Sequence, residues 1–222
     1  LKSMHRLLLT SATYRQASQV EGEHWAKRLA ADPGNRFHSR MNRRRLDGES
    51  LRDTLLKLSG RATQRAGGPG VRPPLPREIT STLLKNQWPI STDTEDHHRR
   101  SVYLFVRRNL RYPLFELFDR PDGTASCARR KESTTAPQSL ILLNSGFSLT
   151  MAKALGKRCE DGEMPTGRSI QRMYGLLFQR APSRKEIRLA KGFLAESNSS
   201  EVKALAQLAL ALINLNEFLF VD

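Results

Sequence analysis

The sequence has few cysteines, the residues that small disulfide-bonded or zinc-binding domains require. Its 222 residues include 2 cysteines, and their positions, Cys127 and Cys159, match no zinc or haem spacing. Two cysteines are too few for a disulfide framework, although a single Cys127–Cys159 bridge stays open if the chain is exported. The sequence contains no CxxCH motif, so this chain cannot itself attach a c-type haem. We therefore expect no cofactor in this chain and no metal site.

Long apolar runs and aromatic residues are also scarce. The longest apolar run, ALAQLALALINL at 204–215, is interrupted by Gln207 and Asn214. It is too short and too polar to span a bilayer, which predicts a buried helix and no transmembrane segment. Aromatic residues make up 7 % of the chain and do not alternate with basic ones, which argues against single-stranded nucleic acid as a ligand.

The chain begins with Leu rather than Met, and no signal segment follows. Its opening residues are already amphipathic. We therefore expect a piece of a longer polypeptide.

Acidic residues are outnumbered by basic ones, giving a formal net charge of +15 and a pI near 10.6. The excess is mostly arginine, with 27 Arg against 10 Lys. Arginine is the residue suited to bidentate recognition of carboxylate, phosphate or sulfate, and it also serves in buried ion pairs. Residues 36–72 carry a net charge of +7, residues 99–131 carry +6, and residues 183–222 are neutral. The positive field therefore belongs to the first two thirds of the chain.

Hydrophobic periodicity predicts a mainly α fold with many helices and a C-terminal helical bundle. One short strand or hairpin is expected near 101–106, where SVYLFV is β-branched and aromatic. We expect one domain over 1–222, with a soft boundary in the Gly- and Pro-rich stretch 66–77 and a helical C-terminal part over 136–222. The expected helices cover residues 3–17, 25–31, 37–59, 136–158, 167–180, 184–196 and 200–219.

Local signals support several of these helix boundaries. Leu51, Leu55 and Leu58 recur at helical spacing, and Gly60 follows where a C-terminal glycine belongs. Two capping boxes, Thr135-x-x-Gln138 and Ser183-x-x-Glu186, mark helix starts. In the first helix, Leu7, Leu8, Ala12 and Tyr14 are the expected core positions.

The stretch DGTASCARRKESTT at 122–135 carries the strongest candidate chemistry. Its thiol, Cys127, is a weak candidate for a catalytic nucleophile, because nearby basic residues and a helix start lower a thiol pKa. A thiol enzyme also needs a base, and the nearest candidates are His97 and His98. An ordinary small residue in a loop is the favoured interpretation of Cys127.

The same stretch has the parts of an anion-binding site at a helix start, namely hydroxyls, backbone N–H groups and guanidinium groups. The alternative is that its arginines pair with Glu116, Asp119 and Asp122 and hold the loop in place. Both interpretations remain open. With the neighbouring arginines, the candidate anion-binding residues are Arg107, Arg108, Arg111, Ser126, Arg129, Arg130, Ser133 and Thr134.

Two further clusters have simpler explanations. Residues 93–98, DTEDHH, contain metal-capable side chains but match no zinc or EF-hand spacing, and a solvated acidic loop is expected there. Residues 42–45, NRRR, are expected on a helix, either as a phosphate-contacting patch or paired with carboxylates elsewhere.

Three long stretches together resemble a known family. They are HRLLLTSATYRQAS at 5–18, NRRRLDGESLRDTLLKLSGR at 42–61, and the stretch at 99–147 that runs from RRSVYLFVRRNLRYPLFELFDR to LNSGF. The chain resembles the C-terminal domain of unknown function, number fifteen fifty-three, of exported planctomycete-type proteins that contain a cytochrome c domain. The resemblance covers almost the whole chain and implies a C-terminal fragment of a parent that is periplasmic or otherwise extracytoplasmic. It also implies that upstream domains of that parent are partners and that one of them carries haem. It supplies no catalytic residues.

Three functional hypotheses follow. The first is an extracytoplasmic accessory domain that binds an anionic partner, such as a sulfated or acidic polysaccharide or an acidic protein. The second is an enzymatic domain, hydrolytic or redox-associated, that uses the 122–135 loop. The third is a nucleic-acid-binding module, suggested by the basic pI and opposed by the neutral C-terminal helices and the implied export.

Overall fold

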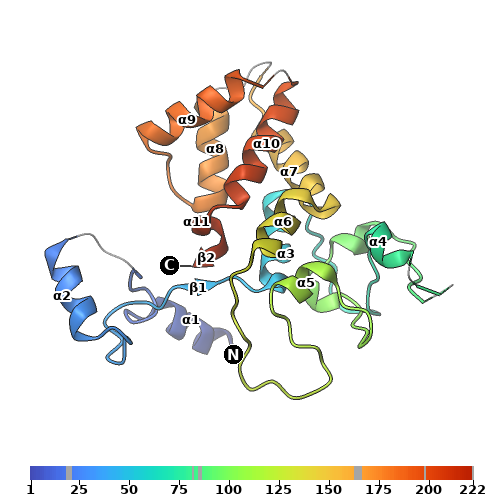
Figure 1. The fold of residues 1–222 in the computed structure, drawn as a ribbon, viewed down its shortest axis with the longest axis horizontal. Coiled ribbons are helices and arrows are strands. Elements are labelled where there is room, and N and C mark those ends of the chain that lie inside the picture. The colour runs from blue at the N-terminus through green and yellow to red at the C-terminus, as the bar shows by residue number, and fades with distance from the viewer. Residues whose placement is uncertain (19–21, 82, 85–86, 163–166, 198, 222) are drawn as a thin grey trace. The chain divides into compact units, whose positions relative to one another are not determined.

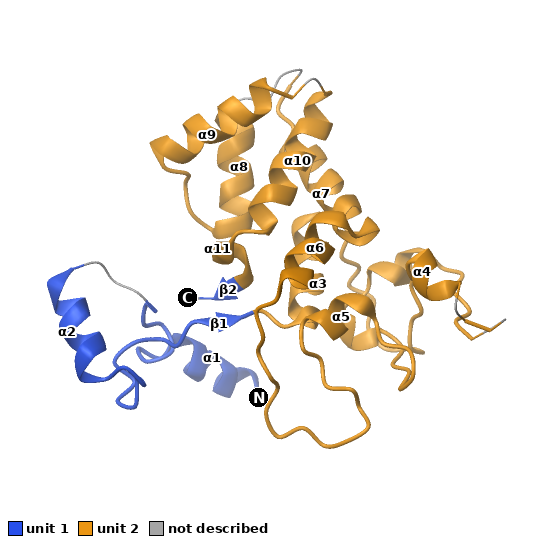
Figure 2. Ribbon diagram, viewed as in Figure 1, with its two compact units in different colours: residues 1–45, 220–222 blue, residues 46–219 orange. Residues whose placement is uncertain are grey.

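The computed structural model describes residues 1–18, 22–81, 83–84, 87–162, 167–197 and 199–221. In this part of the chain the fold is mainly α, as the sequence predicts (Figure 1). It divides into two compact units, residues 1–45 with 220–222 and residues 46–219 (Figure 2). The expected soft boundary at 66–77 lies inside the larger unit, where Val71 is buried and exchanges backbone hydrogen bonds with Tyr103 and Phe105.

The smaller unit contains α1 (Lys2–Thr10), α2 (Glu23–Ala31), β1 (Arg44–Arg45) and β2 (Phe220–Val221). The two strands pair antiparallel, with Arg44 opposite Val221. The turn after α2 is held by Asp32, whose carboxylate accepts backbone hydrogen bonds from Arg36 and Phe37 at 2.9 Å each. These two N–H donors lower the pKa of Asp32.

The first helix differs from its prediction in length and in burial. It ends at Thr10 rather than near residue 17, and none of its residues is buried. Leu7 is 66 % exposed and Leu8 is 56 % exposed, so the expectation that they are core positions is wrong. Tyr14 is 51 % exposed and lies outside the core as well.

The larger unit contains the remaining helices and the hydrophobic core. Its C-terminal part packs α7 tightly against α10, and Gly156 of α7 makes this approach possible: a Cβ there would lie 2.8 Å from the backbone nitrogen of Ala206. The elements are α3 (Gly48–Leu58), α4 (Arg77–Thr80), η1 (Glu95–His98), η2 (Ser101–Tyr103), α5 (Pro113–Leu117), α6 (Ala136–Asn144), α7 (Gly146–Cys159), α8 (Gly167–Phe178), α9 (Arg184–Ala195), α10 (Glu201–Ile213) and α11 (Asn216–Leu219).

Two predicted helices are shorter than expected because polar side chains cap them. The helix expected over 37–59 begins only at Gly48, where the carboxylate of Asp47 accepts a hydrogen bond from the backbone N–H of Ser50 at 2.7 Å. Residues 42–45 are therefore not on a helix. The helix expected over 136–158 is split at Ser145, whose hydroxyl accepts from the N–H of Ser148 at 3.1 Å and starts α7.

The prediction of a strand at 101–106 is wrong in its position. In the described residues the two paired strands are β1 and β2, and neither contains residues 101–106. Residues 101–103 form the 3₁₀-helix η2, and Leu104 makes only an isolated bridge with Val71. The physical cause is Asp53 of α3: it accepts hydrogen bonds from both the N–H and the hydroxyl of Ser101 at 2.6 Å. These bonds divert the backbone from a ladder into a turn.

Candidate functional site

The arginine-rich segment 107–111 forms a tight turn on the larger unit. Arg107 and Leu110 form an isolated bridge, and Nε of Arg107 donates to the side-chain oxygen of Asn109 at 2.9 Å. The guanidinium of Arg107 also donates to the carbonyl oxygen of Gln87. Arg108 is exposed and forms no ion pair with any described carboxylate. Arg107 is therefore held in place, whereas Arg108 is free to bind.

Arg111 connects this turn to the 122–135 loop. Its guanidinium lies 3.3 Å from the carboxylate of Glu116 and 3.8 Å from that of Asp122, at the start of the loop. Both pairs are nearly half exposed, so their attraction is weak. A hollow of about 480 Å³ lies beside them. It is lined by Ile79, Arg108, Asn109, Leu110, Arg111 and Glu116.

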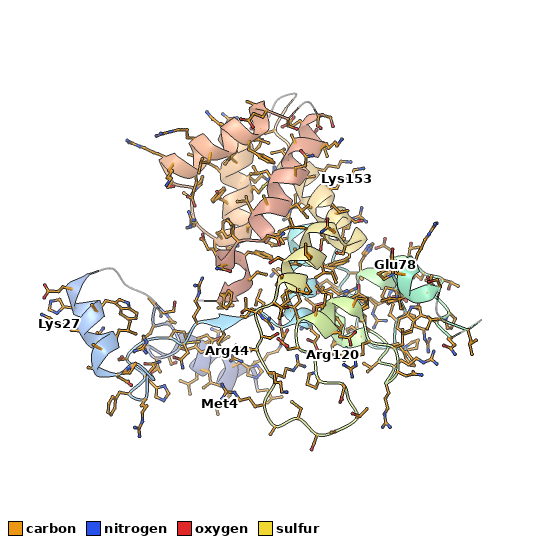
Figure 3. The ribbon with its side chains drawn as sticks, in the orientation of Figure 1. Met4, Lys27, Arg44, Glu78, Arg120 and Lys153 are labelled. Carbon is orange, nitrogen blue, oxygen red and sulfur yellow. The ribbon has the colours of Figure 1, made fainter. Side chains whose placement is uncertain are left out.

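Arg130 does not face this hollow but pins the loop to α3. Its two terminal nitrogens lie 3.0 and 3.2 Å from the two carboxylate oxygens of Glu49, and a third contact reaches Asp47 at 3.5 Å. The hydrogen bond to Glu49 raises the pKa of Arg130. Arg120, labelled in Figure 3, also reaches Glu49, at 3.3 Å. Arg130 thus holds the loop in place, although through α3 rather than through the upstream acids named from the sequence.

The hydroxyl residues of the loop are only partly available. Ser133 donates from its backbone N–H and its hydroxyl to Asp119, at 2.8 Å each. Gln138 then fastens the loop end, because its amide donates to the carbonyl of Leu117 at 2.8 Å. Ser126 and Thr134 are exposed, as is Arg129, which forms no ion pair within the described ranges. The structure therefore does not gather the eight candidate residues around one centre.

Cys127 is exposed on the same loop, and its thiol lies 3.2 Å from the carbonyl oxygen of Arg129. In the described chain no histidine is hydrogen-bonded to this thiol. His97 contacts the carbonyl of Ser91 at 2.8 Å, and His98 is half-buried, with its pKa lowered by burial and by nearby Arg61. The base that a nucleophilic thiol needs is therefore not beside it.

Cys159 is the opposite case. It is fully buried at the end of α7, and burial raises the pKa of its thiol to about 11. Both cysteines are free.

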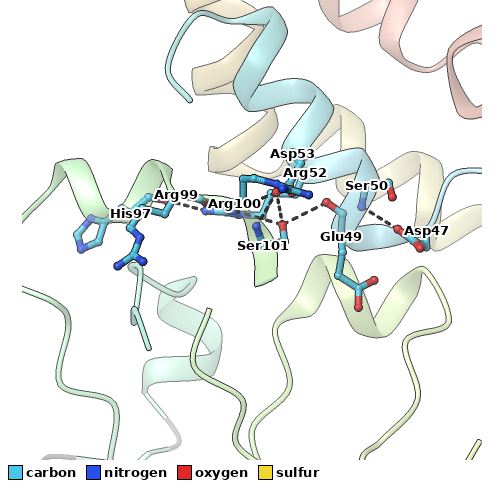
Figure 4. A network of polar contacts seen from close by, with 9 residues as sticks. All are labelled: Asp47, Glu49, Ser50, Arg52, Asp53, His97, Arg99, Arg100 and Ser101. Carbon is cyan, nitrogen blue, oxygen red and sulfur yellow. Dashed lines mark hydrogen bonds and ion pairs between the residues drawn. The ribbon is translucent and has the colours of Figure 1, made fainter. Parts of the chain in front are cut away.

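The most elaborate polar network was not found from the sequence. It centres on Arg52 of α3, which is 1 % exposed (Figure 4). The Arg52 guanidinium donates to the carbonyl oxygens of Arg99 and His97 at 2.8 and 2.6 Å, and it lies 3.3 Å from the hydroxyl of Ser101. Asp53, on the same helix, accepts from Ser101. Two adjacent residues of α3 thus bind the segment that links η1 to η2.

A second buried arginine extends the network. Arg99 is 2 % exposed, its guanidinium donates to the carbonyl of Gly67, and its central carbon lies 4.1 Å from the ring centre of Tyr103. Asp96 is 3.8 Å away and is also bound by Arg65 at 2.9 Å. The acidic stretch 93–98 is thus used in ion pairs. In the described residues no group of three or more His, Cys, Asp or Glu side chains could hold a metal ion, and no helix has the length and apolarity to cross a membrane.

The fold and the network define a basic, mainly α domain whose arginines serve both as buried structural ties and as exposed surface charges. A family model described as PSD1, protein of unknown function (DUF1553), matches residues 1–194. The chain belongs to this family, as the resemblance of its three long stretches indicated. A search of curated proteins and a search of solved structures each found no match.

Proposed function

We propose that this chain is an accessory binding domain of a larger, extracytoplasmic, planctomycete-type protein that contains cytochrome c, and that it recognises a sulfated or acidic polysaccharide. Arg108 and Arg129 provide the main contacts, and Arg111 assists them. The upstream domains of the parent are the further partners in this proposal. The fused haem domain would lie outside this chain.

One observation carries the proposal: Arg108 and Arg111 border the same open hollow, while Arg108 has no described carboxylate partner. An exposed, unpaired guanidinium is already solvated and accessible, and it can form two parallel hydrogen bonds to a sulfate or a carboxylate. Arg111 shares weak contacts with Glu116 and Asp122, which an anionic group can displace at small cost.

The arrangement fits a polymer with repeated charges better than a single small anion. The 107–111 turn and the 122–135 loop meet at the Arg111–Asp122 contact, and Arg108 and Arg129 lie on these two segments. A polysaccharide can bind both segments at once, whereas no described set of side chains encloses a small ligand there. Several weak charge contacts on one chain add up through effective concentration.

Binding of chondroitin sulfate, followed by calorimetry over rising salt, tests the proposal. We expect affinity to fall steadily as salt rises, because each contact releases counterions. The Arg108→Ala/Arg129→Ala variant should bind at least about tenfold more weakly, since a hydrogen bond to a charged group contributes roughly 1.5–3 kcal/mol. Dextran, a neutral polysaccharide, should not bind.

The matched control is Arg184→Ala/Arg188→Ala, which removes two exposed arginines from α9 and the same net charge. If this control weakens binding as much as Arg108→Ala/Arg129→Ala, the effect is one of overall charge and the proposed surface is wrong. Binding that does not change with salt, or no binding at low salt, would also contradict the proposal.

A further inference from the structure

Helices α7 and α10, which approach each other closely at Gly156, border an exposed apolar groove. The groove has a volume of about 500 Å³, within the range of small-molecule sites. One wall comes from α7 and the other from α10, both in the larger unit. It is lined by Leu149, Ala152, Lys153, Ser200, Val202, Lys203, Ala206, Gln207 and Leu210.

The floor and the rim of this groove differ in chemistry. Leu149 is 48 % exposed although it is a large apolar side chain, and Val202 and Leu210 are half-buried. Lys153 and Lys203 are exposed at the edge and form no ion pair with a described carboxylate. Figure 3 labels Lys153 on α7, beside α10. An apolar floor with two unpaired ammonium groups fits a ligand that is both apolar and anionic.

The groove is also polar at one end and apolar at the other. Gly156 lies against Val202 and Ala206, which shows that the C-terminal half of α7 packs on the first turns of α10. Ser200 and Lys203 therefore mark one end of the groove, while Leu149 and Leu210 lie toward the other. At 1.5 Å per residue, the distance from Ser200 to Leu210 along α10 is about 15 Å.

The polar end has a positive charge balance. Ser200 is the N-cap of α10, a helix of 13 residues, so the partial positive charge of the helix start adds to the charge of Lys203 there. Lys153 of α7 lies three residues before Gly156, between this end and Leu149. Glu201 is the opposing charge, but it is 9 % exposed and does not line the groove. With Glu201 counted against Lys153 and Lys203, the groove keeps a net charge of +1.

We propose that this groove binds a long-chain carboxylate, with the anionic head at Lys203 and Lys153 and the alkyl chain along Leu210 and Leu149. The length and the single polar end match an extended fatty-acid chain better than a compact anion. The proposed site shares no residue with the arginine-rich segment 107–111. The failure of one proposal, polysaccharide binding or carboxylate binding, therefore leaves the other unaffected.

Calorimetry with dodecanoate, kept below its micelle concentration, tests the proposal. We expect saturable binding with one site per chain. Lys203→Ala and Lys153→Ala should each weaken it about threefold, the effect of an exposed charge pair. Leu149→Gln should weaken it about tenfold by removing apolar contact. Dodecyltrimethylammonium, which has the same chain and a cationic head, should bind at least tenfold more weakly than dodecanoate.

The controls are Lys191→Ala and Leu189→Gln, which change an exposed lysine and an exposed leucine of α9 outside the groove. They should bind like the wild type, and circular dichroism should show all variants folded. The proposal is overturned if dodecanoate does not bind, if the groove variants bind as the controls do, or if the cationic amphiphile binds equally well. Binding of an acidic amphipathic peptide, but not of dodecanoate, would identify a protein-docking groove and also overturn it.

Discussion

The guanidinium of Arg52 lies 2.8 Å from the carbonyl oxygen of Arg99, a residue 47 positions later in the chain. This contact joins helix α3 to the segment between η1 and η2, and neither partner is a carboxylate. A buried guanidinium is normally costly, but here two backbone carbonyls and a hydroxyl accept hydrogen bonds from its two terminal nitrogens, and the carboxylate of Asp53 lies 3.8 Å away. The arginine excess of this chain is therefore partly structural.

Replacing Arg52 by Leu should destabilise the larger unit by about 3 kcal/mol, because the carbonyls of His97 and Arg99 would lose their donor inside the protein. Urea unfolding followed by circular dichroism measures the change. Arg188→Leu, at an exposed position of α9, should change stability by less than about 0.5 kcal/mol. Equal stability of the two variants would show that the Arg52 hydrogen bonds add nothing to the fold.

A pair of glycine substitutions tests the packing of α7 on α10. Gly156→Ala should destabilise the protein by roughly 1–3 kcal/mol, since its Cβ would lie 2.8 Å from the nitrogen of Ala206 and backbone cannot give way easily. Gly192→Ala is the matched control within α9, where nothing lies within 4 Å of an added Cβ. It should stabilise the protein by roughly 0.5–1 kcal/mol through helix propensity. Thermal unfolding of both variants measures the two changes in stability. Changes of the same sign would contradict the close packing of α7 on α10 at Gly156.

The features that the sequence predicted correctly are local ones. The capping box of Ser183 and Glu186 is present, with hydrogen bonds of 2.7 and 3.3 Å, because both partners lie within one turn. Gly60 follows α3 with a φ of +75°, as a C-terminal glycine should. Such signals need no knowledge of the rest of the chain.

The features that were missed depend on contacts between distant segments. Arg52 entered only the net charge of residues 36–72, although it belongs to the same helical stripe as the buried Leu55 and Leu56, three and four residues on. That stripe was the available signal. In the candidate site, Arg130 could not be assigned from the sequence, since its partner Glu49 lies 81 positions away. Arg108 and Arg129 stay candidates because no described carboxylate pairs with them.

The ion pair of Glu186 with Arg180 predicts a loss of stability in acid. The hydrogen bond from Arg180, at 2.6 Å, lowers the pKa of Glu186 from 4.5 to about 2. A carboxylate with a lowered folded pKa contributes stability that is fully present above its unfolded value and is lost as pH falls through the folded value. The loss should therefore run from about pH 4.5 down to about pH 2.

Because both side chains are partly exposed, the contribution should be only about 1 kcal/mol. Unfolding at a series of pH values should show that Glu186→Gln is less stable than the wild type at pH 7, with the difference shrinking toward pH 2. The control Glu196→Gln, at an exposed position that forms no described ion pair, should leave the profile unchanged. A constant difference across this range would exclude the ion pair as the cause.

The two thiols should react very differently with an alkylating agent. Cys127 is exposed, whereas Cys159 is 0 % exposed and has a pKa raised to about 11, so its reactive thiolate is scarce as well as inaccessible. We expect iodoacetamide at pH 8 to label one thiol per native chain and two in denaturant, as counted by mass spectrometry. Cys127→Ser should abolish the native labelling. The rate at Cys127 also tests the enzymatic hypothesis: labelling no faster than that of a free thiol peptide removes the case for a nucleophile, and labelling at least tenfold faster would restore it.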